Sequence, residues 1–216
     1  MSLAMQLLLL DVWGLLSSLA IALAIYFFGG ALAGEYLAVM FAFLISATIV
    51  TMMGREKKED LGIYEYGRSW QNVLANGVVP VLSLALGAPY AYFGAISATI
   101  ADKFSSEIGA LGATPIFLGD LKPAKKGTSG AITAMGLVAG VFGSIIVSAT
   151  VYLLFPGVGL GFALLLPVVG LAGTLADSVA GVFETRGIGD KATSNLAGAL
   201  TGAVFGQLIA FALGLV

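Results

Sequence analysis

The chain has 216 residues, of which 59% are hydrophobic and 10% are charged, and its mean hydropathy is +1.02. Soluble domains average about 25% charged residues, so 10 basic and 12 acidic side chains could not coat a globule of this length. This composition excludes a disordered chain, an ordinary cytosolic domain and a nucleic-acid-binding protein. It predicts an all-α polytopic membrane protein with a single integral membrane domain over residues 1–216, and the 30 glycines suit close packing of helices in lipid.

The sequence contains neither cysteine nor histidine. That absence excludes disulfides, thiolate nucleophiles, Ser-His-Asp triads and zinc sites built on these residues. Any catalysis must therefore use carboxylates, amines, hydroxyls, backbone groups or a hard metal held by oxygen.

Seven apolar segments are candidates to cross a membrane, which takes roughly 20 mostly apolar residues. In chain order they are 7–28, 36–53, 73–87, 90–109, 131–154, 162–183 and 195–215. The third is short and contains Pro80, so its limits are the least sharply marked. The first resembles a signal peptide before Ala31-Leu32-Ala33, but it contains Asp11 and has no basic region before it, so we expect it to be retained.

All 10 basic residues fall on one side of this seven-span arrangement. They lie in the connections 54–72, 110–130 and 184–194, or near the end of a span that leads into one, whereas the opposite connections contain none. By the positive-inside rule the basic side is cytoplasmic. We therefore expect a multi-pass protein of the cell membrane with a cytoplasmic N-terminus and an external C-terminus.

Short patterns recur in the spans that share an orientation. Segments 46–49, 97–102 and 173–177 resemble one another. The pair of segments 128–129 and 141–143 likewise resembles the pair 193–194 and 204–206. Two explanations stay open: parallel helix-hairpin repeats, or chance similarity among helices rich in Ala, Gly and Ile.

Three carboxylates lie within spans or at their cytoplasmic ends: Asp102, Glu107 and Asp177. A charge in the bilayer costs several kcal/mol, so such residues usually face the bundle interior and serve a function. Glu107 follows Asp102 by about 140° around a helix, so the two can share one polar wall. The structural alternatives are an ion pair between Lys103 and Glu107, and a hydrogen bond from Asp177 to a neighbouring helix.

The connection 110–130 carries the most chemistry. Lysines 122, 125 and 126 precede a Gly-Thr-Ser-Gly segment at 127–130, where we expect the next helix to begin. Free backbone N–H groups and the helix dipole favour an anion there, and glycines let a phosphate approach the backbone. The simpler alternative is a positive-inside loop with an ordinary Thr or Ser cap. Carboxylates that converge on such a loop favour a metal–phosphate site, in which Mg²⁺ shares oxygen ligands with substrate phosphates.

Asn76 and Asn195 are further polar candidates, each near the cytoplasmic start of its span, with an interhelical hydrogen bond as the alternative role. Gly198, Gly202 and Gly206 form a ridge of small residues, which predicts helix packing.

Taken in order, these residues resemble the integral-membrane family that includes plant phytyl-phosphate kinase. The resemblance extends over about 71–206 and rests on Leu74-Ala75-Asn76-Gly77, Ala101-Asp102, Ser106-Glu107-Ile108-Gly109, Lys122, Gly127-Thr128-Ser129-Gly130, Asp177-Ser178, Gly181 and Asn195. CTP-dependent polyisoprenol kinases and membrane cytidylyltransferases are similar more distantly. Lys103 stands where the family usually has Thr, and Lys125-Lys126 replace a Pro pair, so both departures add positive charge.

The resemblance implies a phosphotransferase that moves a phosphoryl group from CTP or ATP to a phytyl or polyprenyl monophosphate in the membrane. Asp102, Glu107 and Asp177 would then be catalytic and hold Mg²⁺. The phosphate-binding residues would be Asn76, Lys122, Lys126, Gly127, Thr128, Ser129 and Asn195. The active site would lie on the cytoplasmic face, with the lipid as partner and no nucleic acid, and the sequence leaves open whether the chain forms a homo-oligomer.

Two other functions remain as alternatives. A nucleotidyltransferase acting on a lipid phosphate would use the same groups but release pyrophosphate. A transporter would use Asp102 and Asp177 as ion sites within the membrane. The repeats, if real, are parallel, so they give no argument from inverted symmetry.

Overall fold

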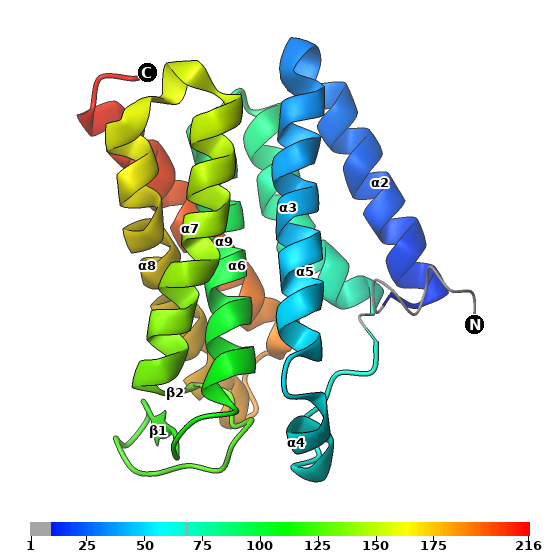
Figure 1. Ribbon diagram of the computed structural model, residues 1–216, viewed down its shortest axis with the longest axis vertical. Coiled ribbons are helices and arrows are strands. Elements are labelled where there is room, and N and C mark those ends of the chain that lie inside the picture. The colour runs from blue at the N-terminus through cyan, green and yellow to red at the C-terminus, as the bar shows by residue number, and fades with distance from the viewer. Residues whose placement is uncertain (1–9, 68) are drawn as a thin grey trace.

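The computed structural model describes residues 10–67 and 69–216, and most of these are helical. The helices are α2 (Val12–Gly29), α3 (Ala33–Met52), α4 (Arg55–Asp60), α5 (Trp70–Ala85), α6 (Pro89–Gly109), α7 (Ala134–Leu154), α8 (Gly159–Thr185) and α9 (Lys191–Ala212). Two short strands, β1 (Ile116–Phe117) and β2 (Ala131–Ile132), pair antiparallel in the connection between α6 and α7. The expected all-α architecture is confirmed (Figure 1).

Four stretches of the described chain are long and apolar enough to cross a membrane: Val12–Met52, Ala134–Leu154, Pro156–Thr185 and Lys191–Ala212. The first of them contains both α2 and α3. Helix α5 has 16 residues with Pro80 inside it, and α6 carries three charged residues near its end, so neither has the composition of a helix that faces lipid. The number of seven crossings and the cytoplasmic N-terminus stay predictions.

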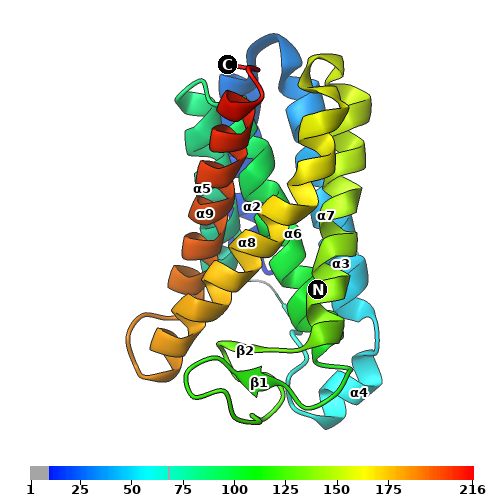
Figure 2. The same ribbon diagram turned by 90° about the vertical axis from the view of Figure 1, so that its left-hand side faces the viewer.

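Helix α6 lies at the centre of the bundle (Figures 1 and 2). Every residue from Tyr90 to Ala101 is buried, and the helix packs against α3, α5, α7, α8 and α9. Because protein surrounds α6, its charged last turns face other helices instead of hydrocarbon, which is where intramembrane charges are tolerated. The central helix of the bundle, α6, is therefore also the helix that carries Asp102 and Glu107.

Glycines bring α9 close to its neighbours. A Cβ atom on Gly206 would lie 2.5 Å from the carbonyl oxygen of Tyr90 in α6, and one on Gly198 would lie 3.0 Å from the carbonyl oxygen of Gly173 in α8. A Cβ on Gly202 would collide with the backbone of Gly94. The predicted packing role of the glycine ridge is confirmed, because each of its members allows two backbones to touch.

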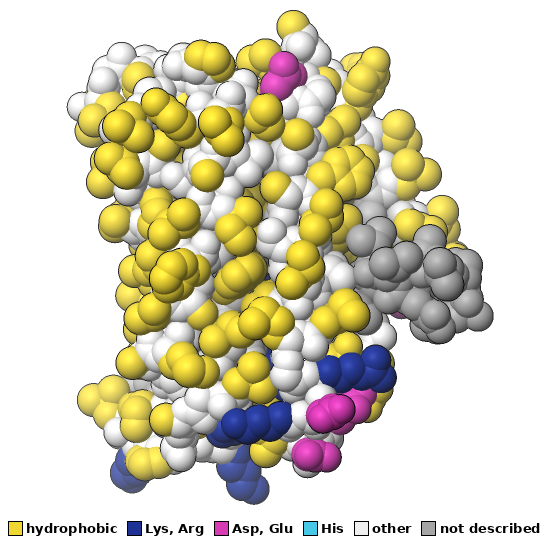
Figure 3. All heavy atoms as spheres, in the orientation of Figure 1, with side chains coloured by type: hydrophobic (Ala, Val, Ile, Leu, Met, Phe, Trp, Pro, Cys, Tyr) yellow, Lys and Arg dark blue, Asp and Glu magenta, His cyan; other side chains and the backbone are white. Residues whose placement is uncertain are grey.

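Three connections gather at one end of the bundle: the α3–α5 connection with α4, the α6–α7 connection with the strands, and the α8–α9 turn (Figures 1 and 2). Lysine and arginine side chains cluster at this end in Figure 3, whereas apolar side chains cover the length of the helices. Arg68 lies outside the described residues. The one-sided distribution of basic residues thus agrees with the fold, whereas the repeat origin of the hairpins stays a prediction.

Two predicted boundaries are wrong for reasons of local capping. The fifth span was expected from residue 131, but residues 131–132 pair as β2 and the Thr133 hydroxyl caps α7 by accepting from Gly136 N at 2.9 Å. The seventh was expected from residue 195, but Asp190 forms a capping box with Thr193 and starts α9 at Lys191.

Candidate functional site

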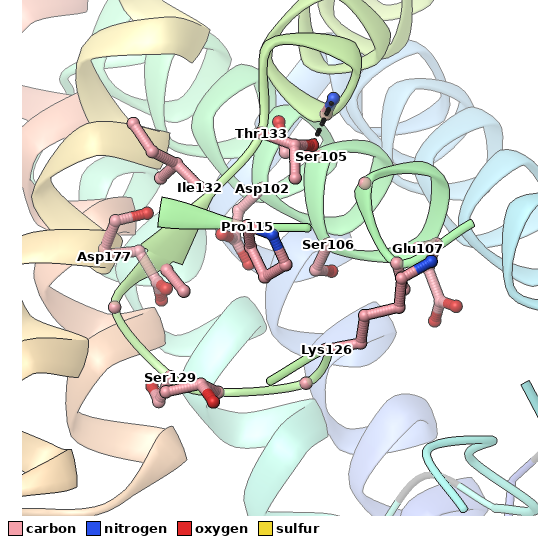
Figure 4. A pocket seen from close by; sticks show the side chains of 18 of the residues that line it. Asp102, Ser105, Ser106, Glu107, Pro115, Lys126, Ser129, Ile132, Thr133 and Asp177 are labelled. Atoms are coloured by element: carbon pink, nitrogen blue, oxygen red, sulfur yellow. Dashed lines mark hydrogen bonds between the residues drawn. The ribbon is translucent and has the colours of Figure 1, made fainter. Parts of the chain in front are cut away.

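A cavity of about 410 Å³ opens at the charged end of the bundle. Its walls come from α6, α8, the beginning of α9 and the α6–α7 connection. Figure 4 shows Asp102 and Asp177 on different helices, with Lys126 and Ser129 on the loop that runs beside them. Seven of the predicted site residues line this cavity, namely Asp102, Glu107, Lys126, Gly127, Thr128, Ser129 and Asp177.

Two carboxylates and a lysine form a polar cluster in the wall of the cavity. Asp177 of α8 is buried, and its Oδ1 accepts from Lys191 Nζ at 3.0 Å. Its Oδ2 is buried with no hydrogen-bond partner. Asp102 of α6 lies close enough to interact electrostatically with both Asp177 and Lys191. One face of the Asp177 carboxylate is thus left to a cation or a donor brought by a ligand.

Glu107 belongs to a separate ion-pair cluster. Its Oε2 accepts from Lys58 Nζ at 2.6 Å, and its Oε1 lies 2.7 Å from Lys103 Nζ and accepts from Thr51 Oγ1 at 3.0 Å. The predicted ion pair with Lys103 is confirmed, and Lys58 from α4 adds a partner that the sequence did not indicate. Among the residues that the structure describes, no three acidic side chains form a group that could hold a metal ion. Glu107 is held in an ion-pair cluster with Lys58 and Lys103, so the structure does not bring the three expected carboxylates into one such group. A metal-binding role of Asp102 and Asp177 stays a prediction.

The Gly-Thr-Ser-Gly loop packs directly on α8. A Cβ on Gly181 would lie 2.5 Å from Gly130 N, so the two backbones touch at this point. Ser129 Oγ donates to Glu184 Oε2 at 2.7 Å, and Thr185 Oγ1 donates to the carbonyl oxygen of Ser129 at 2.8 Å. The loop was expected at the beginning of a helix, which is wrong, since α7 begins at Ala134. The contacts with α8, and not the N-terminus of a helix, hold the loop beside the cavity.

The two predicted phosphate-binding lysines have different surroundings. Lys126 lines the cavity and donates to the carbonyl oxygen of Gly112 at 2.6 Å. The Lys122 side chain is 76% exposed and lies 3.7 Å from Asp120, and it lines none of the cavities described here. The assignment of Lys122 to the phosphate site stays a prediction. The chain turns back just before this residue, since Phe117 N donates to the carbonyl oxygen of Lys122 at 2.8 Å and Leu121 has a positive φ of 57°.

Asn76 and Asn195 line a smaller pocket of about 70 Å³ beside the main cavity. Asp102, Lys103 and Lys191 line it as well, so it adjoins the carboxylate cluster. Asn195 Oδ1 is buried with no hydrogen-bond partner. Both asparagines therefore lie in a pocket that adjoins the main cavity, next to the charged residues that line both spaces.

Several residues of the cavity were not singled out from the sequence: Lys58, Glu65, Glu184 and Lys191. The capping signal of Asp190 and Thr193 marks the first turn of α9, so it could have placed Lys191 at the beginning of that helix. No comparable signal marks Lys58, which lies 49 residues from Glu107 in the chain.

The donor set fits a magnesium–phosphate complex better than a metal held by protein alone. Mg²⁺ is usually bound through one or two carboxylates, waters and substrate phosphates. Asp102 and Asp177 supply two carboxylates, and the free Oδ2 of Asp177 is available as a ligand. Lysines 103, 126 and 191 around the same cavity supply positive charge for the phosphates.

Comparisons with known proteins agree with a membrane fold. The family model described as Integral membrane protein DUF92 matches residues 1–204. The chain is 36% identical over 208 residues to an uncharacterized membrane protein of Methanocaldococcus jannaschii, covering 93% of this chain and 85% of that protein. It is 29% identical over 183 residues to Protein PGR of Arabidopsis thaliana, covering 68% of this chain and 63% of the plant protein. No solved structure gives a significant match. The chain belongs to the integral membrane protein DUF92 family.

Proposed function

We propose that this protein is an isoprenoid-phosphate kinase. It would transfer the γ-phosphoryl group of CTP or ATP to a prenyl monophosphate held in the membrane and release the prenyl diphosphate. The site would face the cytoplasm, as the positive-inside rule predicts for the basic end of the bundle. The resemblance of the sequence motifs to the family of plant phytyl-phosphate kinase supports the choice of substrate.

One observation carries the proposal. Two carboxylates, one with a free buried oxygen, share a cavity with lysines and a glycine-rich loop at the basic end of the bundle. Phosphoryl transfer depends mainly on alignment of the phosphates and on neutralisation of their charge. The cavity brings together the groups that perform these two tasks, and it does so without histidine or cysteine.

The reaction needs no general base. A phosphate monoester has a second pKa near 6, so its oxygen is already ionised at neutral pH. That oxygen attacks the γ-phosphorus, the bond from the γ-phosphorus to the β–γ bridging oxygen breaks, and the electron pair leaves with the nucleoside diphosphate. Lys126 and Lys191 would hold the phosphates in line, and the hydroxyl of Thr128 would donate to a phosphate oxygen. The hydroxyl of Ser129 donates to Glu184, so Ser129 would position the loop beside the phosphates.

Asp102 and Asp177 would hold Mg²⁺ on the phosphates. The chemistry that the ion supplies when bound is neutralisation of the negative charge on the transferred group and its leaving oxygen. Lys191 would keep the Asp177 carboxylate oriented, since it already holds Oδ1 and leaves Oδ2 free. Glu107 would act on the site only indirectly, by positioning Lys103.

The test is an activity screen of the purified full-length chain in lipid nanodiscs. CTP or ATP would be combined with Mg²⁺ and prenyl monophosphates, and the lipid products identified by mass spectrometry. A prenyl diphosphate together with a nucleoside diphosphate is the expected result. A nucleotide-capped lipid with pyrophosphate would replace the kinase by a nucleotidyltransferase, and flux of prenyl phosphate in sealed liposomes without nucleotide would replace it by a transporter.

A further inference from the structure

An apolar groove adjoins the small asparagine pocket, with which it shares three lining residues. It has a volume of about 240 Å³ and is formed by α2, α3 and α5, with Leu15, Leu19, Met40, Leu44, Val73 and Gly77 among its walls. These three helices form one edge of the bundle (Figure 1). Leu15 and Leu19 are 44% and 56% exposed, so the groove is open along the lipid-facing surface of α2.

The small pocket adjoins both the groove and the charged cavity, because it shares lining residues with each. Phe43, Asn72 and Asn76 line both the groove and the small pocket. Asp102, Lys103 and Lys191 are among the residues that line both the small pocket and the charged cavity. The three spaces thus form a series that runs from an apolar wall, past amide side chains, to a cluster of charges.

This order of surfaces matches an amphiphile with one tail. An anionic head would lie among the lysines, and an apolar chain would gain van der Waals contacts with the walls of the groove. The intermediate pocket has about 70 Å³, which suits a single narrow link between head and tail rather than a glycerol unit that carries two chains.

We propose that the groove between α2, α3 and α5 binds the isoprenoid tail next to the phosphate. This inference rests on the proposed function, since it assigns a tail to the lipid phosphate of that site. Asn72 and Asn76, one turn apart on α5, mark the point where the tail meets the head. The remainder of a long tail would continue into the bilayer past Leu15 and Leu19.

The experiment measures equilibrium binding of radiolabelled geranylgeranyl monophosphate to the purified chain in nanodiscs. Ala22 lines the groove, whereas Ala20 on the same helix is exposed and lines none of the three spaces. Ala22→Phe should weaken binding about tenfold, as expected when roughly two methylene groups lose their burial. Ala20→Phe should change it less than about twofold. Ser18→Phe, in the groove, and Ser17→Phe, outside it, form a second matched pair should Ala22→Phe fail to fold.

Competitors identify the ligand class. Dimethylallyl monophosphate, which has a short tail, should bind the Ala22→Phe and Ala20→Phe chains equally, because it does not reach far into the groove. Dioleoyl phosphatidate should compete poorly, and competition equal to that of the prenyl phosphate would overturn the single-tail assignment. Equal binding of geranylgeranyl monophosphate by both phenylalanine variants of a pair would show that the tail does not bind in the groove.

Failure of this inference can be told apart from failure of the proposed function. If the wild-type chain forms no diphosphate but Ala22→Phe alone loses binding, the tail binds in the groove and the proposed kinase activity is wrong. If Ala22→Phe forms the diphosphate with the wild-type KM for geranylgeranyl monophosphate, the proposed kinase activity holds and tail binding in the groove is wrong.

Discussion

Lys58 Nζ donates to Glu107 Oε2 at 2.6 Å, and the two side chains are only 1% and 10% exposed. This pair joins the short helix α4 to the end of the central helix α6. Lys58 Nζ also donates to the carbonyl oxygens of Val50 and Thr51, at 3.2 and 3.0 Å, so it ties the end of α3 to the same place. A residue that looked like a metal ligand in the sequence is therefore part of the packing that holds one wall of the cavity.

Removal of Glu107 should destabilise the protein. Glu107→Leu leaves Lys58 buried without its carboxylate, and loss of one partner of a buried ion pair costs about 3–5 kcal/mol. The double variant Lys58→Met/Glu107→Leu should recover part of this loss, because no charge is left uncompensated. Thermal unfolding in detergent measures the effect, with Arg55→Ala as the control at an exposed ion pair. Equal melting temperatures for Glu107→Leu and Arg55→Ala would contradict this role.

Lys126 and Lys122 provide a matched test of the phosphate site. Lys126→Met should lower kcat/KM about 100-fold or more, the loss typical for removal of one group that stabilises charge in a transition state. Lys122→Met should leave activity within about twofold, since its side chain is 76% exposed and outside the cavity. Steady-state kinetics with the prenyl monophosphate measures both. A larger loss of activity for Lys122→Met would show that Lys122 acts in the phosphate site.

Activity should depend on a divalent cation through Asp102 and Asp177. Chelation by EDTA should abolish activity, and added Mg²⁺ should restore it. Asp177→Asn should raise the Mg²⁺ concentration for half-maximal activity at least about tenfold, because changes around metal ligands typically cost 10–100-fold in affinity or activity. Glu107→Gln should not change that concentration. A magnesium titration of each variant separates these outcomes, and an unchanged titration in Asp177→Asn would remove the metal assignment.

The contact between Gly130 and Gly181 should be needed for activity more than for folding. A Cβ in Gly181→Ala would meet Gly130 N at 2.5 Å, so the loop must move away from α8. Gly161→Ala, near the other end of α8, meets no atom within 4 Å and serves as the control. We expect Gly181→Ala to lower kcat about tenfold or more, as small displacements of positioning groups do, while the chain stays monodisperse in gel filtration. Wild-type kcat in Gly181→Ala would show that the loop does not contact the substrate.

Hydropathy predicted most of the helical framework, because helices that face lipid must be apolar along their length. It also indicated that Asp102 and Asp177 lie at one end of the bundle, since alternate spans share an orientation. The ion pair of Glu107 with Lys58 could not be predicted, because Lys58 comes from a different part of the chain and only tertiary packing brings the two together. The exposed place of Lys122 could not be predicted either, because a turn with positive φ at Leu121 directs the loop, and the sequence gives little warning of such a turn in a leucine.

The close approach of Gly130 to Gly181 has a thermodynamic consequence for ligand binding. Fixing the backbone of a loop costs roughly 1–2 kcal/mol of conformational entropy per residue. Here Ser129 and Gly130 are already packed on α8 when the protein folds, before any ligand arrives. If the loop binds phosphates as we propose, the affinity should carry little of the unfavourable binding entropy that accompanies loops which become ordered around a ligand.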